Sequence, residues 1–364
     1  MSNKIIIAAD THFGVQGRLD DILWSVRVMR EYCHLADINT VIIAGDLFHD
    51  RKSIDIEVMS KTCDFFEETQ EKFNQQWIAF PGNHDMFLRH SWNINSLRAM
   101  NKHMTIIEDV KILKINDTRF WVLPFITYEK SYMRVLDKIN EQYQEGDILL
   151  THIGVKGAVL NSCFLLKDWS TVSFEDSPFH RVYTGHFHCQ QQVGENVWYP
   201  GSLIPFKFDE GNISHGFYVY DLDDDSHKFI NIWKAGAKFF PDEPAPPQFL
   251  TITDDSIGQI TNEDVSGNLV RIALSRDYAH SDKQEFKDHI INLGAKAVRW
   301  MQLKEKQTEI KPQETALDNK DLFITYIESD DKGTKELNLK ILKKLNEDVM
   351  KEGDEKYAVD SQNY

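Results

Sequence analysis

The chain has 364 residues, of which 41% are hydrophobic and 12% aromatic, and its net charge is −16. This length suits two domains, the composition excludes a disordered chain, and the acidic balance argues against a generally basic nucleic-acid coat protein. We find neither an apolar run of about 20 residues nor a signal-peptide cleavage pattern, so we expect a cytoplasmic protein without membrane contact. The cysteines Cys33, Cys63, Cys163 and Cys189 form no CxxC pair, which predicts reduced thiols.

The first two-thirds of the chain alternates apolar runs with helical patterns. Residues 4–9, 40–44 and 77–80 are short apolar runs of the kind that forms buried strands. Between them, apolar residues recur at three- and four-residue steps over 19–36 and 59–73, which predicts two helices. This order predicts an α/β domain with helices packed on sheet faces.

More strand-like segments follow, and we assign them to a second sheet. These segments are 110–115, 119–123, 148–151, 182–184, 197–199 and 216–221. The predicted fold class is therefore α/β, a two-sheet β-sandwich flanked by helices, over residues 1–240.

A proline-rich segment separates this domain from the rest of the chain. Pro241, Pro244, Pro246 and Pro247 are four of the ten prolines, and they predict a semi-rigid linker. A small α/β domain is predicted at 248–305, with three strands and one helix that Gly294 caps. A polar stretch follows, and residues 320–352 carry two short amphipathic helical patterns.

Five apolar runs of the first domain end in side chains that commonly bind metals. These ends are Asp10-Thr11-His12, Gly45-Asp46, Gly82-Asn83-His84-Asp85, His152, and Gly185-His186-Phe187-His188. Because the carboxyl ends of strands in an open α/β sheet border one crevice, we expect these side chains to converge. A single Asp-x-His motif would be weak evidence for a metal site, but five strand ends with side chains of this kind predict one. Oxygen and imidazole without thiolate favour Mn²⁺, Fe or Zn²⁺ over a structural zinc.

The donors are too many for one ion, which predicts two metals about 3.5–4 Å apart that share a carboxylate. Such a pair polarises a phosphoryl group and lowers the pKa of a bridging water. The sequence therefore predicts phosphoester hydrolysis without a covalent enzyme intermediate.

These segments resemble the calcineurin-like metallophosphoesterase pattern. Three segments further resemble the SbcD-type DNA-repair nuclease subunits. They are Asp10-Thr11-His12-Phe13-Gly14, Gly45-Asp46-Leu47-Phe48-His49, and Tyr199-Pro200-Gly201-Ser202 through Phe208-x-Glu210 to Gly216-Phe217. The resemblance covers about the first 220 residues, with Phe13 in place of the usual Leu and Leu203 in place of the usual Pro.

The resemblance implies two bound divalent ions and favours Mn²⁺ over Mg²⁺ as their identity. Asp10, His12, Asp46 and His188 would hold one ion, and Asp46, Asn83, His152 and His186 the other. His84 would lie beside the scissile phosphate, where it stabilises charge or protonates the leaving 3′ oxygen. Asp85 either orients His84 or shapes the loop, and His49 either lies near the substrate or has a capping or surface role.

The resemblance also implies the substrate and the partners. The substrate would be DNA, cut as a 3′→5′ exonuclease on duplex ends and as an endonuclease on single strands or hairpins, in end processing, repair and recombination. Arg51, Lys52, Arg89 and His90 follow the metal loops and either meet phosphates or are solvated charges.

We expect a homodimer of phage or bacterial type, which would lie in the host cytoplasm if phage-encoded. The C-terminal apolar stripes either pack on their own domain or, as we favour, bind an SbcC-type SMC-like ATPase. These stripes comprise Leu322, Phe323, Tyr326, Leu337, Ile341 and Leu345.

Two other classes stay open. One is a phosphoesterase for small or protein substrates, although protein phosphatases of this type carry G-N-H-E where this chain has Gly82-Asn83-His84-Asp85. The other is a non-catalytic scaffold, which has little support because every expected ligand position is filled.

Overall fold

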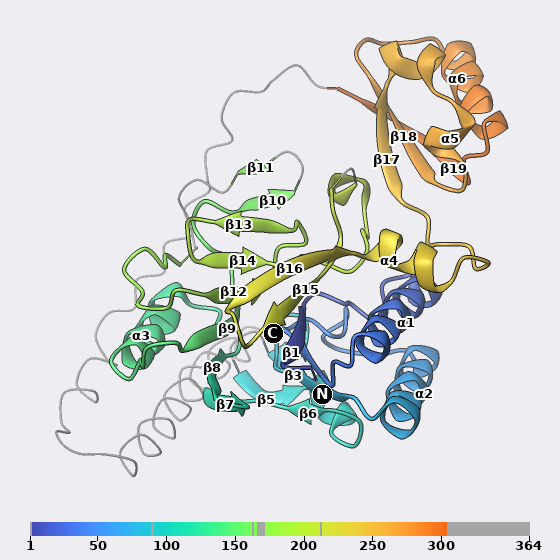
Figure 1. Cartoon of the computed structure of the whole chain (residues 1–364). Helices are drawn as coiled ribbons and strands as arrows, with labels where there is room; N and C mark the ends of the chain where they lie inside the picture. Colours follow the sequence, from blue (N-terminus) through green and yellow to red (C-terminus); the bar gives the residue numbers. More distant parts are fainter. Residues whose placement is uncertain (1, 89–90, 162–163, 166–171, 212, 304–364) are drawn as a thin grey trace. The chain divides into compact units, whose positions relative to one another are not determined.

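The computed structural model describes residues 2–88, 91–161, 164–165, 172–211 and 213–303 (Figure 1). The chain divides into two compact units, one up to Leu250 and one from Thr251. Among the described helices, none is both long and apolar enough to cross a membrane. Cys33, Cys63 and Cys189 are free thiols. Cys163 and the helices predicted at 320–352 lie outside the described residues.

Two six-stranded sheets form the centre of the first unit. The strands of the first sheet are β1 (Lys4–Ala8), β2 (Thr40–Ile43), β3 (Gln76–Ala79), β6 (Thr105–Ile106), β15 (Gly216–Asp221) and β16 (Ser226–Asn231). Those of the second sheet are β7 (Lys111–Ile115), β8 (Thr118–Leu123), β9 (Ile148–His152), β12 (Val182–Gly185), β13 (Gln191–Val193) and β14 (Val197–Tyr199). Their orders are β16-β15-β1-β2-β3-β6 and β13-β14-β12-β9-β8-β7. The predicted two-sheet α/β fold is confirmed.

The placement of residues 216–221 in the second sheet was wrong. β15 belongs to the first sheet and pairs antiparallel with β1, with Ile6 opposite Val219. The alternating Gly-Phe-Tyr-Val-Tyr-Asp sequence specifies a strand, but it does not specify a partner more than 200 residues away in the chain.

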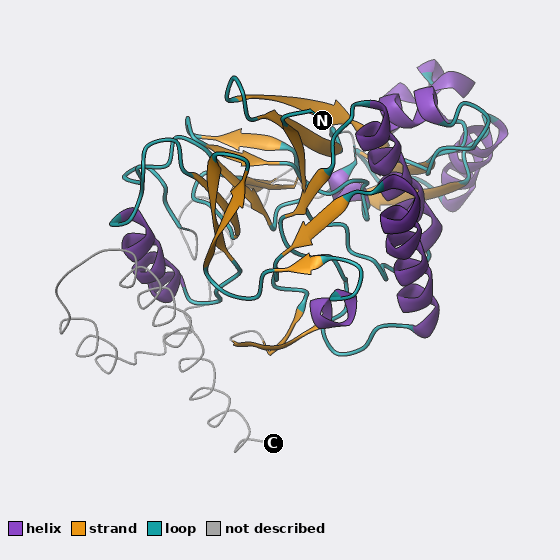
Figure 2. Ribbon diagram, turned by 60° about the horizontal axis from the view of Figure 1, so that its bottom comes forward, coloured by secondary structure: helices purple, strands orange, loops and turns teal. Residues whose placement is uncertain are grey.

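The strands of the first sheet are buried on both faces, and their side chains alternate between two cores. Ile6 and Val41 face a core shared with the helices, whereas Ile5 and Ile42 face a core shared with the second sheet. The helices α1 (Leu19–Leu35) and α2 (Ile56–Phe73) lie side by side on the helix face (Figure 2).

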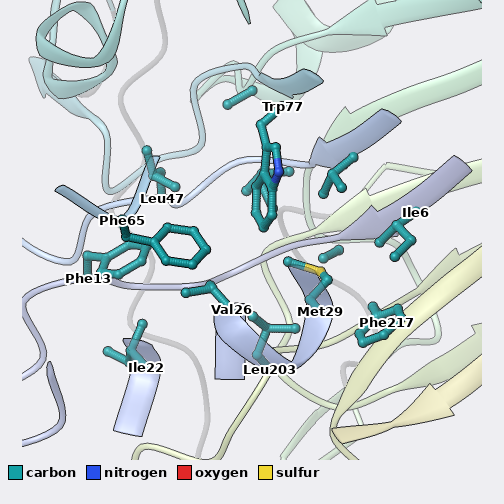
Figure 3. Packing of buried hydrophobic residues seen from close by; sticks show 14 of the residues in the cluster. Ile6, Phe13, Ile22, Val26, Met29, Leu47, Phe65, Trp77, Leu203 and Phe217 are labelled. Atoms are coloured by element: carbon teal, nitrogen blue, oxygen red, sulfur yellow. The ribbon is translucent and has the colours of Figure 1, made fainter. Parts of the chain in front are cut away.

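Figure 3 shows part of the helix-side core, in which Val26 and Met29 of α1 lie below Trp77 of β3. Leu203, which stands where the resembled family usually has proline, is 1% exposed in this core. The loop at this position therefore contributes to packing and is not a solvated turn.

The ends of the helices follow from local chemistry. The Asp55 side chain caps α2 by accepting the main-chain N–H of Glu57 at 2.8 Å, and Asn74 ends the helix with a φ of 49°. The helix α4 (Ile232–Phe239) packs on α1 at Gly236, where a Cβ would lie 2.1 Å from the Trp24 ring. Only glycine allows this approach.

The helices α4 and α3 (Glu129–Asn140) were not expected from the sequence. The helix α3 covers the outer face of the second sheet, where the Tyr132 hydroxyl hydrogen-bonds to that of Thr151 at 2.8 Å. The unit also has two small hairpins. Their strands are β4 (Met86–Leu88), β5 (Ser91–Asn95), β10 (Val159–Asn161) and β11 (Phe164–Leu165).

The proline-rich segment is fixed to the first unit. The indole N–H of Trp233 donates to the carbonyl of Pro246 at 3.2 Å, and the Arg18 guanidinium donates to that of Pro247 at 3.3 Å. An ion pair joins Arg27 to Glu243 at 2.8 Å. This segment is therefore held by side chains of the first unit along its length.

The second unit is a small α/β unit with its own core. Its elements are β17 (Phe249–Thr253), whose first two residues belong to the first unit, α5 (Asn262–Val265), β18 (Leu269–Leu274), α6 (His280–Asn292) and β19 (Ala297–Gln302). The strand order is β17-β18-β19, and Ile272 and Ile290 belong to the buried cluster. Gly294, with a φ of 98°, follows α6, and Ala295 N–H closes the helix end on the Ile290 carbonyl.

Candidate metal centre

The carboxyl ends of five strands converge on one site in the first unit. Asp10 and His12 follow β1, Asp46 follows β2 and Asn83 follows β3. His152 ends β9, and His186 and His188 follow β12. Because β1, β2 and β3 run parallel, as do β9 and β12, these ends lie at the same edge of the two sheets.

The backbone at this edge is strained. Asp10, His12 and Asp46 have φ angles of 53°, 50° and 54°, and His186 has 99°. Non-glycine residues rarely adopt this region, at a cost of about 1–3 kcal/mol each. Main-chain hydrogen bonds brace the loops, because the Asp10 N–H donates to the Gly45 carbonyl and the His12 N–H to that of Asp46. Such strain is typical of sites that pre-organise their side chains.

We define the first half-site as Asp10, His12 and His188. The Nε2 atoms of the two histidines are 3.0 Å apart, and Nε2 of His12 lies 4.0 Å from Oδ1 of Asp10. Two nitrogens bound to one cation at about 2.1 Å and at a right angle are themselves about 3 Å apart. The spacing therefore fits a shared metal ion.

We define the second half-site as Asn83, His152 and His186. Oδ1 of Asn83 lies 2.7 Å from Nδ1 of His186 and 3.2 Å from Nε2 of His152. Asp46 lies between the half-sites, with Oδ2 3.3 Å from Nε2 of His152 and 3.7 Å from Nε2 of His12. This carboxylate is therefore placed to bridge two ions.

The hydrogen bonds of His152 fix which nitrogen faces the site. Its Nδ1 lies 2.8 Å from the Ala44 carbonyl, which only accepts, so Nδ1 carries the proton. In the neutral ring Nε2 then presents a lone pair toward the oxygens of Asn83 and Asp46. When the ring has given up its second proton, Nε2 and these oxygens are all acceptors, and their spacing fits a cation between them.

The pKa shifts divide the histidines of this donor set. Although burial opposes the shift, the Asp46 carboxylate raises the pKa of His152 to about 9, so a metal ion must displace a proton from this ring. Two other rings are neutral without a metal. Burial lowers the pKa of His12 well below its usual value, and burial lowers that of His186 to about 3. Both rings are therefore neutral at neutral pH, as metal binding requires. Burial raises the pKa of Asp10 to about 6, and a bound cation would favour the ionised form of this carboxylate.

Three glycines make room for the donors. A Cβ on Gly45 or Gly185 would lie 2.2 Å or 2.6 Å from Nδ1 of His152, and a Cβ on Gly82 would lie 2.2 Å from Oδ1 of Asp46. Any larger residue would displace these donors.

His84 and His49 lie beside the first half-site. The His84 N–H donates to Asp46 at 2.7 Å, and its Nδ1 donates to the His49 carbonyl at 2.6 Å. The His84 ring lies 4.9 Å from that of His12 and stacks on that of His49 at 5.3 Å. Nδ1 of His49 lies 3.4 Å from Nδ1 of His12, and burial lowers the pKa of His49. His12, His49 and His84 together form a further group of possible metal ligands.

The Asp85 carboxylate is directed at main-chain N–H groups. It accepts N–H groups from Leu47 at 3.3 Å, Phe48 at 3.1 Å and Gly82 at 3.0 Å. Burial raises its pKa to about 7, while the N–H groups of Phe48 and Gly82 oppose that rise. Of the two roles considered for Asp85, this geometry favours shaping the loops after β2 and β3.

Glu210 is a site residue to which the sequence analysis gave no role. It is 2% exposed, and its Oε1 lies 2.8 Å from Nδ1 of His188. Although burial opposes ionisation, His188 holds the pKa of Glu210 at about 2. Its place in the Phe208-x-Glu210 motif was the available signal, but only the fold brings it to His188.

The structure describes two of the four residues that were expected either to meet phosphates or to be solvated charges. Lys52 is exposed and Arg51 is half-buried on the loop after Asp46. Arg89 and His90 lie outside the described residues.

The sequence comparisons point to phosphoesterases. The sequence model of the calcineurin-like phosphoesterase family matches residues 3–190. A protein of Invertebrate iridescent virus 6 that carries the name phosphoesterase 244L is 26% identical over 222 residues, which are 57% of this chain and 72% of that protein. The SbcD component of the SbcCD nuclease of Staphylococcus epidermidis is 25% identical over 255 residues, 60% of this chain and 66% of that protein. The solved structure of GAP50, the anchor in the inner membrane complex of Plasmodium, has a TM-score of 0.40 at 10% identity and covers 63% of this chain and 88% of its own.

Proposed function

Because the chain belongs to the calcineurin-like phosphoesterase family, we propose that it is a two-metal phosphodiesterase that cleaves DNA, as an SbcD-type nuclease subunit. The observation that carries the proposal is the convergence of seven oxygen and nitrogen donors. They are Asp10, His12, Asp46, Asn83, His152, His186 and His188.

The proposed ions, Mn²⁺ or Mg²⁺, would be held by the two half-sites with Asp46 between them. Bound there, divalent ions polarise a phosphoryl group and activate water. The chain itself supplies their positions through strained loops, through the glycines behind His152 and Asp46, and through the neutral imidazole of His12.

His84 is the proposed proton donor. The His49 carbonyl keeps the proton of the neutral ring on Nδ1, so any second proton that the ring takes up binds Nε2. From Nε2 this proton can pass to the leaving 3′ oxygen, a step worth about 10²–10⁴ in rate. The His84 N–H also holds Asp46, which couples the proton donor to the metal pair.

DNA as the substrate is supported by the similarity to the SbcD component of the SbcCD nuclease and by the resemblance of the Tyr199 to Phe217 segment to that family. The similarity to the viral phosphoesterase supports the second candidate, a phosphodiesterase or phosphatase for other substrates. The proposed nuclease is an exonuclease on duplex ends and an endonuclease on hairpins.

The proposed partners are DNA, a second copy of the chain and an SMC-like ATPase that binds residues 320–352. Removal of residues 320–364 should leave a folded, metal-binding nuclease that no longer co-purifies with the ATPase. Unfolding of the truncated chain would contradict this partner assignment.

The function is tested by incubating the full chain with end-labelled duplex DNA, hairpin DNA and bis-para-nitrophenyl phosphate, with Mn²⁺, Mg²⁺ or EDTA. We expect Mn²⁺-dependent loss of the DNA label. Turnover of the small ester with intact DNA would instead support the second candidate.

A further inference from the structure

The first half-site is held in place by a buried acidic side chain that is not a metal ligand. Glu210 lies in the short turn Phe208–Glu210, and its Oε1 accepts the Nδ1 proton of His188 at 2.8 Å. The opposite nitrogen of the ring, Nε2, is the atom that lies 3.0 Å from Nε2 of His12. The carboxylate and the site therefore lie at opposite ends of one imidazole.

The second oxygen of Glu210 holds a neighbour of the same histidines. Its Oε2 accepts the main-chain N–H of Phe206 at 2.8 Å. The Phe206 ring packs edge-on against His188 at 5.6 Å and against His12 at 5.4 Å. The Glu210 carboxylate therefore fixes His188 directly, and through Phe206 it also restrains the rings of His188 and His12.

Glu210 is itself held rigidly. Nε2 of His215 lies 2.9 Å from its main-chain carbonyl, and the Phe208 ring packs on that of Phe249 at 4.9 Å. A Cβ on Gly211 would lie 2.0 Å from the Phe249 carbonyl, so the chain passes very close behind this turn. These contacts fix the main chain from which the acidic side chain extends.

We propose that Glu210 is a positioning residue, which fixes His188 as the tautomer that carries its proton on Nδ1 and offers Nε2 to the metal. This inference rests on the proposed assignment of His188 as a ligand. Carboxylate partners of this kind orient a metal-binding histidine and raise its basicity, and their loss typically lowers metal affinity about 10–100-fold.

The test is a calorimetric titration of the full metal-free chain with Mn²⁺, for the wild type, Glu210→Gln and Asp209→Asn. Glutamine keeps the size of Glu210, but it cannot accept from both His188 and Phe206. We expect two sites in the wild type, one of them weakened about 10–100-fold in Glu210→Gln. Asp209→Asn removes a neighbouring charge of the same turn and should match the wild type.

Both sites at wild-type affinity in Glu210→Gln would overturn the inference. Equal weakening in Asp209→Asn would also overturn it, because loss of negative charge alone would then explain the effect. A wild type that binds no Mn²⁺ would instead refute the metal site of the proposed function.

A second measurement does not use the Glu210 variant. Nitrogen NMR of ¹⁵N-histidine-labelled wild type with Zn²⁺, assigned with His188→Gln, reports the His188 tautomer. We expect a protonated Nδ1 and a metal-bound Nε2. The opposite tautomer would contradict the role of Glu210.

Discussion

The two half-sites orient their histidines by different means. In the second half-site, Nδ1 of His152 is held by the main-chain carbonyl of Ala44, and the absent side chains of Gly45 and Gly185 make the space. In the first half-site, Nδ1 of His188 is held by the side chain of Glu210, 22 residues further along the chain. Backbone shape thus determines the second half-site, whereas a replaceable side chain determines the first.

The largest effect is expected where the half-sites meet. Asp46→Asn removes the charge that lies between His12 and His152, so both half-sites should lose metal and cleavage should fall below detection. Mn²⁺ titration and DNA cleavage measure this. Asp50→Asn changes an exposed carboxylate of the same loop and should have no effect. Loss of only one ion in Asp46→Asn would show that the carboxylate does not bridge.

The next effect separates proton transfer from metal binding. His84→Ser should reduce DNA cleavage about 10²–10⁴-fold while both Mn²⁺ ions still bind, because its ring is the proposed proton donor. The control is His103→Ser, after η1 (Ser96–Met100). Wild-type cleavage by His84→Ser would remove this residue from the mechanism.

The dependence of the second half-site on backbone shape can be tested at Gly185. In Gly185→Ala the new Cβ would lie 2.4 Å from the Ala44 carbonyl and 2.6 Å from Nδ1 of His152. We expect the free energy of unfolding to fall by about 1–3 kcal/mol and the second ion to bind weakly. Gly258→Ala is the control, because a Cβ there meets nothing within 4 Å. If Gly185→Ala weakens only the first half-site, the contrast between the half-sites is wrong.

The smallest effect is expected at Asp85, which serves both half-sites through main chain. Asp85→Asn replaces one acceptor oxygen that faces the N–H groups of Leu47, Phe48 and Gly82. Urea unfolding should show a loss of about 1–3 kcal/mol, whereas exposed Asp117→Asn should show none. Unchanged stability with lost cleavage would favour the alternative in which Asp85 orients His84.

The sequence predicts what is local and regular. The strands before each donor, α1, α2 and α6 follow from periodicity and from caps such as Gly294. The helix α3 was missed, although Tyr132, Val135 and Ile139 recur at helical spacing. The placement of β15 failed because strand pairing with β1 is a long-range choice that alternation does not encode.

The residues of the metal centre show the same division between local features, which the sequence predicts, and long-range contacts, which it does not. The donors were found because each follows a strand end. The role of Glu210 and the direction of the Asp85 carboxylate were not predicted, because each depends on a hydrogen bond that only the folded loops create.

The central claim is that these donors form two distinct metal sites, and counting ions tests it most directly. Elemental analysis and Mn²⁺ titration should give two ions per chain in the wild type. His188→Ala should lose the first-half-site ion and His152→Ala the second, each retaining one. A wild type with a single ion, or two single variants that both retain two, would contradict the account.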